Sequence, residues 1–280
     1  MTDSPFTDTP GSPAAKGSSL GQRAAPRPSV VILAIFLLSA PLLLLGELSR
    51  ARLLPGVPLS ALMFLCIALV AIWAAHRTGG WASVRGLLAR VSDWRRARPR
   101  RWLVVAALLM PLVLAVEYVL MRLLGIPLPS PQPAWPRLPL LFALLFIPAA
   151  CEELAWSATL CEPLQASYTA LGAALIIGAS WALLHVGPYL QAGRDASWIL
   201  GQLLFTVAFR VVLVWLYDAS GQSLFAATIG HAAYNTAWQL FPDHGSGYDP
   251  WLTAALTTVV AALPIALFGA RTLTRREPSP

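Results

Sequence analysis

The sequence contains few charged residues, which make up only 12% of its 280 positions. A soluble domain averages about 25% charged and about 45–50% apolar residues, whereas 57% of this chain is hydrophobic and its mean hydropathy is +0.64. A water-soluble globule of this length could not hide so large an apolar share beneath its surface. The composition therefore excludes a soluble enzyme, a disordered chain and a collagen-like repeat.

Several motifs of known chemistry are also missing. The three cysteines, Cys66, Cys151 and Cys161, lie in or beside apolar runs without CxxC spacing. This is not the pattern of a disulfide framework, and we expect small buried side chains. The one GxSxG match, GSSLG at 17–21, lies in the polar segment before the first apolar run rather than at a strand-to-helix turn, and no HExxH zinc sequence occurs.

What the sequence does have is a series of apolar runs about 20 residues long, the length that crosses about 30 Å of hydrocarbon as a helix. They are too long for the alternating strands of about ten residues in a membrane barrel. The sequence therefore predicts an all-α fold, a polytopic transmembrane bundle of about eight helices in the lipid bilayer. The expected spans are 30–46, 57–75, 102–124, 138–160, 169–190, 197–217, 221–241 and 251–270.

The net charge of +7 comes from 20 basic against 13 acidic residues. Eight arginines fall between Arg77 and Arg101, between two spans, where the positive-inside rule places a cytoplasmic loop. No aromatic-interleaved basic surface accompanies them, so nucleic-acid binding is not favoured. With both termini cytoplasmic, fourteen basic residues lie inside and only four outside, namely Arg50, Arg52, Arg137 and Arg194. We expect an integral multi-pass protein of a bacterial inner membrane.

The chain divides into four segments by composition. Residues 1–29 are rich in Pro, Ser, Thr and Gly and predict a disordered cytoplasmic tail, followed by an uncleaved first span rather than a signal peptide. Residues 30–124 hold the first helices and the basic loop. A proline-dense connection at 125–137 predicts an extended loop before the spans of 138–241. Residues 251–280 form the last span and a basic tail.

Ionisable side chains inside spans are costly, so each one is a candidate functional residue. The first group is CEELAW at 151–156, where two adjacent carboxyls differ by about 100° around a helix and cannot face one partner. Pro148, just before it, could open the helix there. The alternative is a carboxylate pair that simply meets water near a helix end. The candidates are Glu117, Glu152, Glu153, His185, Arg210 and His231, with the uncharged Asn235.

Two further motifs place histidines one helical turn from a partner. Trp181 and His185 share a helix face, as do His231 and Asn235, which could both donate to one oxygen. Ordinary interhelical hydrogen bonding and close packing could explain either motif alone. Together, a carboxylate, a histidine and a His/Asn pair are the parts needed to activate water and hold a tetrahedral intermediate. Their place in an apolar bundle indicates hydrolysis of a bond inside or beside the membrane.

The three motifs, in this order on separate spans, resemble those of the CPBP family of intramembrane glutamic endopeptidases. That family includes the CAAX prenyl endopeptidases and bacteriocin-processing or self-immunity (Abi-type) proteins. Its pattern is EExxxR, then FxxxH, then HxxxN/D; here the segments read EELAWS at 152–157, WALLH at 181–185 and HAAYN at 231–235. The stretch 209–235 also resembles the family's link between its last two motifs. The resemblance covers about 138–241, which it implies to be the catalytic core.

The resemblance also implies a role for each matching residue. Glu152 and His185 would activate water, Glu153 would support them, and His231 with Asn235 would bind the oxyanion. No metal or cofactor is implied, and the partner would be a peptide or protein substrate at the membrane.

Two departures from the family pattern matter. Ser157 stands where the family has arginine, and Trp181 replaces phenylalanine, whose apolar role it can fill. We predict that Arg210 faces the bundle interior and neutralises Glu153, compensating for Ser157; the alternative is that it snorkels to the headgroups.

Three other functions remain open on the sequence. The same Glu/His set could bind zinc in a metalloprotease. Glu117, Glu152, Glu153 and the histidines could form the relay of a proton-coupled transporter. The loss of the motif arginine at Ser157 could also mark a catalytically inactive scaffold or immunity factor.

Overall fold

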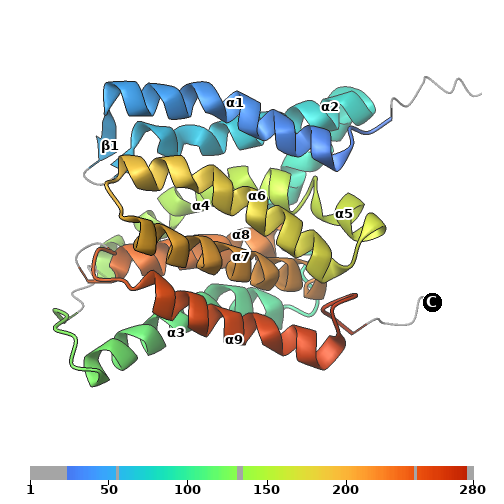
Figure 1. Ribbon diagram of the computed structural model, residues 1–280. Helices are drawn as coiled ribbons and strands as arrows, with labels where there is room; N and C mark the ends of the chain where they lie inside the picture. Colours follow the sequence, from blue (N-terminus) through green and yellow to red (C-terminus); the bar gives the residue numbers. More distant parts are fainter. Residues whose placement is uncertain (1–23, 55–56, 131–134, 243–244, 276–280) are drawn as a thin grey trace, which may run out of the picture.

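The computed structural model describes residues 24–54, 57–130, 135–242 and 245–275. In these ranges the chain forms eight long helices and one short one, α5, with a small β1–β2 hairpin (Figure 1). The predicted all-α bundle of about eight helices is confirmed. The elements are α1 (Pro28–Ser49), β1 (Arg52–Leu54), β2 (Val57–Pro58), α2 (Met63–Ala89), α3 (Arg101–Leu123), α4 (Leu138–Trp156), α5 (Cys161–Ser167), α6 (Ala170–Gln191), α7 (Ala196–Ala219), α8 (Leu224–Leu240) and α9 (Pro250–Phe268), with single 3₁₀ turns at Leu59–Leu62, Arg90–Ser92 and Trp135–Arg137.

The bundle is built around α7, the most buried of the apolar helices. Helix α7 packs against α6, α8 and α9, while α8 packs against α3 and α4; α2 and then α1 cover the other side of α4. Gly178 on α6 allows the close approach to α7, because a Cβ there would lie 3.1 Å from both the Arg210 Cβ and the Val207 Cα. Small residues at helix contacts let backbones approach in this way.

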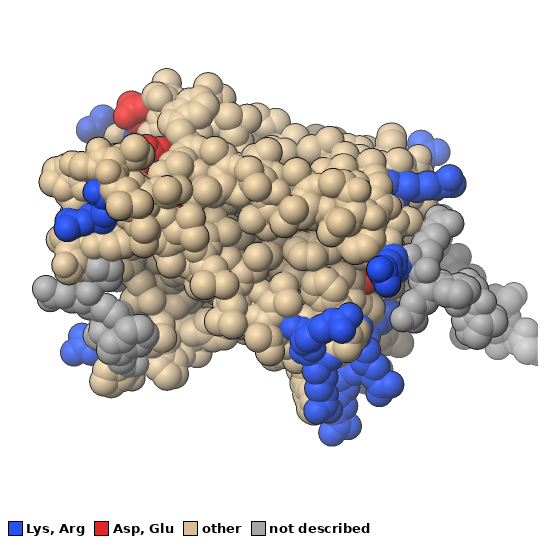
Figure 2. Space-filling model, turned by 90° about the horizontal axis from the view of Figure 1, so that it is seen from below, with Lys and Arg blue, Asp and Glu red and all other residues tan. Residues whose placement is uncertain are grey.

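Within the described ranges, seven helical segments are long and apolar enough to cross a membrane. Helix α8, with 17 residues, is shorter than these, although it lies where the span 221–241 was predicted. Figure 2 shows charged side chains gathered at the two ends of the molecule, with an uncharged band between them. A bilayer-spanning protein requires such a band, with backbone hydrogen bonds satisfied inside each helix.

The structure corrects several predicted bounds. Helix α2 continues to Ala89, well past the predicted end at 75, with non-helical backbone at Gly79 and Gly80. The fourth span ends at Trp156, and the separate α5 follows it. The connection 125–137 ends in a 3₁₀ turn at Trp135–Arg137 rather than being extended throughout. Helix α1 already begins at Pro28; most of the predicted disordered tail, 1–23, lies outside the described residues.

At each end of the bundle, hydrogen bonds join segments that are distant in the sequence. At one end, the Arg98 amide donates to the Ser220 carbonyl (3.3 Å) and the Arg96 Nε donates to the Gly221 carbonyl (2.9 Å). At the other, the Gln191 side chain donates to the Leu43 carbonyl (2.8 Å). Helix α1 begins and α9 ends at the same end, opposite the β1–β2 hairpin (Figure 1). The arginine-rich loop and the terminal helix ends therefore share one end of the molecule.

Candidate active site

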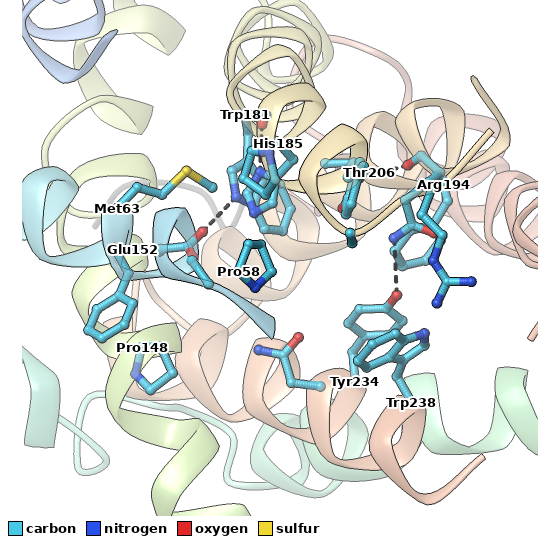
Figure 3. A pocket seen from close by; sticks show the side chains of 18 of the residues that line it. Pro58, Met63, Pro148, Glu152, Trp181, His185, Arg194, Thr206, Tyr234 and Trp238 are labelled. Atoms are coloured by element: carbon cyan, nitrogen blue, oxygen red, sulfur yellow. Dashed lines mark hydrogen bonds between the residues drawn. The ribbon is translucent and has the colours of Figure 1, made fainter. Parts of the chain in front are cut away.

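A cavity of about 300 Å³ lies between α2, α4, α6, α7 and α8 (Figure 3). It brings together candidate residues from three helices that are distant in sequence. Glu152 comes from α4, Trp181 and His185 from α6, and His231 and Asn235 from α8. The sequence motifs thus converge on one space inside the bundle.

The two adjacent glutamates have different surroundings. Glu152 lines the cavity and is 8% exposed, whereas Glu153 is fully buried and does not line it. The Trp181 indole Nε1 donates a hydrogen bond of 2.6 Å to Glu152 Oε2. Pro148, one turn earlier on α4, also lines the cavity. Residue reasoning alone could not choose between the carboxylates, but only Glu152 is in position to meet a molecule in the cavity.

Glu153 is held by three neighbours. Arg210 forms a bidentate ion pair with it, with Nη1 2.9 Å from Oε2 and Nη2 3.0 Å from Oε1. Both side chains are fully buried. His231 Nδ1 lies 3.0 Å from Oε1, and the Ser157 hydroxyl donates to Oε2. The predicted contact between Arg210 and Glu153 is therefore present, and snorkelling of Arg210 is excluded. Bidentate Arg–carboxylate pairs fix geometry as well as charge.

Trp181 contacts most of the other candidate residues. Besides its bond to Glu152, its ring lies under the Arg210 guanidinium, 4.3 Å from the centroid, within cation–π range. It meets the His185 and His231 rings edge-to-face, with centroids 5.7 Å and 5.1 Å apart. A purely apolar role for Trp181 is therefore incomplete, because the indole N–H also holds a carboxylate that phenylalanine could not bind.

The hydrogen bonds of both histidines fix where their protons lie. His185 Nδ1 is 2.9 Å from the Trp181 carbonyl, which can only accept, so Nδ1 carries the hydrogen. By the same reasoning His231 donates from Nδ1 to Glu153, whose carboxylate is paired with Arg210. In the neutral rings, Nε2 then keeps a lone pair free to accept a hydrogen bond.

Asn235 lines the cavity one turn after His231 and makes no side-chain hydrogen bond to any described residue. Its amide N–H₂ is thus available to a bound molecule. His231 could add a second donor through Nε2 only if its ring were protonated, since Nδ1 is already used. Of the expected oxyanion pair, Asn235 is the donor that needs no change of protonation.

Residues 133–237 match the family model described as type II CAAX prenyl endopeptidase Rce1-like. This part of the chain is therefore similar to the Rce1-like family. The matched residues include the whole of α4 to α7 and most of α8, and therefore every candidate residue except Glu117. No curated protein matches the chain.

Sequence reasoning missed several residues that line the cavity. Gln202 lies inside a span and lines the cavity, so its polarity should have put it beside Asn235 among the candidates. Its amide oxygen accepts from the Tyr248 hydroxyl (3.0 Å), and its Nε2 lies 3.4 Å from the Tyr234 hydroxyl. Arg194 and Trp198 line the cavity near the β-hairpin end, and only their burial pattern in the folded protein reveals them.

Glu117, the remaining buried carboxylate of the candidate set, lies outside the cavity. It accepts from the Asp249 amide (3.0 Å) and from the Thr253 hydroxyl, and so ties α3 to the start of α9. A relay that includes Glu117 has no side-chain hydrogen bond joining it to Glu152 or Glu153 among the described residues. Glu117 therefore joins α3 to α9 and does not contribute to the cavity.

No group of three or more His, Cys, Asp and Glu side chains among the described residues is placed to hold an ion. The Glu153 oxygens are engaged by Arg210, His231 and Ser157, and the Arg210 guanidinium would repel a cation beside them. These side chains are arranged to bind one another.

A second hollow, of about 910 Å³, lies on another face of α8, between α3 and α4. Its walls are almost wholly apolar, and no candidate residue lines it. Residues of α8 divide between the two spaces: His231 and Asn235 face the first cavity, and Ala233 and Ala237 face the second.

Proposed function

We propose that the chain is a glutamic-type intramembrane endopeptidase that hydrolyses a peptide bond without a metal. The observation that carries this proposal is the shared cavity of Glu152, His185, His231 and Asn235 inside an Rce1-like domain. A base, a histidine and a free amide donor around one space are what acyl hydrolysis requires. The buried ion pair of Glu153 and Arg210 supplies the support that the family's motif arginine would give.

In this mechanism a water molecule binds between the Glu152 carboxylate and His185 Nε2. Glu152 takes a proton from the water, and the oxygen attacks the carbonyl carbon of the substrate peptide bond. The carbonyl oxygen becomes an oxyanion and accepts a hydrogen bond from the Asn235 amide. When the tetrahedral intermediate collapses, the C–N bond breaks and Glu152 returns its proton to the leaving nitrogen. The products are a carboxylic acid and an amine, and Glu152 is regenerated.

Glu153 acts on this chemistry through its neighbours rather than on the substrate. Its ion pair with Arg210 keeps it a hydrogen-bond acceptor, so His231 stays oriented with Nδ1 toward it. Trp181 links this pair to the cavity, because its ring contacts Arg210 and its N–H holds Glu152. Precise placement of a base by such neighbours is worth much of its catalytic effect.

New peptide termini in membranes test the proposed function. Membranes from cells that produce the wild-type chain or its Glu152→Gln variant are compared by mass spectrometry of peptide N-termini. Wild type should generate termini that the variant does not, and cleavage by the purified protein in proteoliposomes should persist in a strong chelator. Identical termini in both would refute the endopeptidase, and chelator-sensitive cleavage restored by zinc would replace it with a metalloprotease.

Asn235→Ala is expected to lower kcat while leaving KM nearly unchanged. One oxyanion donor typically contributes on the order of 10²–10³ in rate, because it acts on charge that develops only in the transition state. Steady-state kinetics on a peptide spanning an identified cleavage position measure both constants. A rise in KM with unchanged kcat would instead assign Asn235 to substrate binding.

Trp181→Phe is expected to lower kcat by about 10- to 100-fold, with little change in KM. The ring and its contacts with Arg210 remain, but the donor to Glu152 is lost, and hydrogen bonds to charged groups are worth about 1.5–3 kcal/mol. Trp215→Phe is the matched control, because Trp215 does not line the cavity and its Nε1 has no hydrogen-bond partner among the described residues. Equal effects of the two substitutions would reduce Trp181 to a packing residue.

A further inference from the structure

The cavity is closed toward one end of the bundle. On α7 it is lined by Gln202, Phe205 and Thr206, whereas the next turn, Phe209 and Arg210, is fully buried and does not line it. The same change occurs after Glu152 on α4, where Trp156 is fully buried, and before Trp181 on α6, where Ile177 is fully buried. The catalytic candidates therefore form the floor of the cavity.

Toward the other end the cavity reaches the surface connections of the helices. Pro58 comes from the β-hairpin, and Ala192 and Arg194 from the connection between α6 and α7. Trp198 lies in the first turn of α7 and Trp238 in the last turn of α8, at this same end. Figure 3 shows Arg194 and Trp238 on the side of the cavity away from Glu152. The mouth thus lies at the hairpin end of the molecule.

This mouth is opposite the end that carries most of the positive charge. The arginine-rich segment 77–101 packs against the turn between α7 and α8, at the end where α1 begins and α9 ends. Basic loops are retained on the cytoplasmic side, and eleven basic residues of the described part of the chain belong to this end, namely Arg27, the eight between Arg77 and Arg101, Arg271 and Arg275. The hairpin end is then the extracytoplasmic one.

The few arginines at the hairpin end are concentrated around the mouth. Arg194 lines the cavity, with its guanidinium 4.5 Å from the centroid of the Trp198 ring, and forms no ion pair with a described residue. Arg50 and Arg52 line an adjoining cleft of about 290 Å³ that shares Pro58 with the cavity and contains one acidic residue, Glu47. Three of the four arginines predicted to lie outside therefore surround the route to Glu152.

We infer that the substrate reaches the site from the extracytoplasmic face, as a peptide segment with an acidic group that binds Arg194. Arg194 is the cation of the cavity wall, and Glu152 is its buried anion. A guanidinium that stacks on tryptophan keeps its N–H groups free for a carboxylate. That the bound peptide is a substrate rests on the proposed function, whereas the side of the membrane on which the cavity opens is a property of the folded chain alone.

Accessibility of single cysteines tests the side without any need for cleavage. In a chain whose three native cysteines are replaced by alanine, Ala192→Cys marks the mouth and Ser92→Cys, exposed in the arginine-rich segment, marks the opposite end. A membrane-impermeant maleimide added to intact cells should label the first variant and not the second, and inside-out vesicles should reverse this. The opposite pattern, or an Ala192→Cys variant that reacts from neither side, would overturn the inference.

Kinetics test the acidic group separately. On a cleaved peptide that contains an acidic residue, Arg194→Gln should raise KM about tenfold and leave kcat unchanged, an effect typical of one charged hydrogen bond. Arg137→Gln, an exposed arginine away from the cavity, is the matched control. Equal KM values for wild type and Arg194→Gln would overturn recognition of the acidic group. If the maleimide labelling came out as expected but the wild-type protein cleaved no peptide, the endopeptidase proposal would fail while the side of the cavity mouth would stand.

Discussion

Glu152→Gln is expected to reduce kcat by at least about 10³-fold while the protein still inserts and folds. Glutamine keeps the size of the side chain but cannot take the proton from water. Removing a group that acts as one unit with its partners typically costs on the order of 10⁴ or more in kcat. His185→Ala should cause a loss of similar size, because both residues are assigned to the same water molecule. Turnover is measured on a peptide spanning an identified cleavage position.

Matched variants separate this effect from general damage. Glu47→Gln makes the same chemical change at an exposed carboxylate outside the cavity, and His76→Ala does so for an exposed histidine. Both should retain wild-type kcat. If Glu152→Gln or His185→Ala turned over at near wild-type rates, the assignment of water activation would be wrong.

Arg210→Leu is expected to lower the free energy of unfolding by about 3–5 kcal/mol and to abolish cleavage. The substitution leaves the Glu153 carboxylate fully buried without its cation. Removing one partner of a buried ion pair destabilises a protein far more than replacing both partners by apolar residues. Reversible unfolding in detergent measures the change. Arg77→Leu, an exposed arginine on α2, is the control and should have little effect.

Two second-site substitutions identify why Arg210→Leu loses stability and activity. Adding Glu153→Gln to Arg210→Leu should recover much of the lost stability, because it removes the unpaired charge. Adding Ser157→Arg should restore part of the activity, since position 157, directly after the end of α4, already contacts Glu153. If Arg210→Leu were fully active, or if Ser157→Arg restored nothing, Arg210 would not be the substitute for the motif arginine.

Much of the fold follows from the sequence because lipid imposes simple rules. Apolar runs of helix-spanning length predicted the bundle, although a run does not show where a helix bends, as at Gly79 and Gly80 in α2, or where it stops, as at Trp156. Those ends depend on contacts with other helices. The pairing of Arg210 with Glu153 was predictable because a buried cation and a buried anion at similar depth must each find a partner.

Other parts of the site could not be predicted from spacing. Trp181 belonged to an apolar position of a motif, and only the rotation of α6 against α4 turns its N–H toward Glu152. The cavity wall formed by Gln202 and Trp198 depends on which face of α7 is inward, and an almost uniformly apolar helix carries little pattern to show it. The separation of Glu152 from Glu153 followed from helix geometry, but the hydrogen bond from Trp181 to Glu152 did not.

The central claim is that one cavity, entered from the hairpin end, holds the peptide bond between Glu152 and Asn235. A structure of the Glu152→Gln variant with an uncleaved peptide tests it most directly. We expect the carbonyl oxygen of the target bond ~3 Å from the Asn235 amide nitrogen, a water beside His185, and the rest of the peptide passing Arg194. A peptide bound instead in the apolar hollow between α3, α4 and α8, with Asn235 and His185 untouched, would contradict the account.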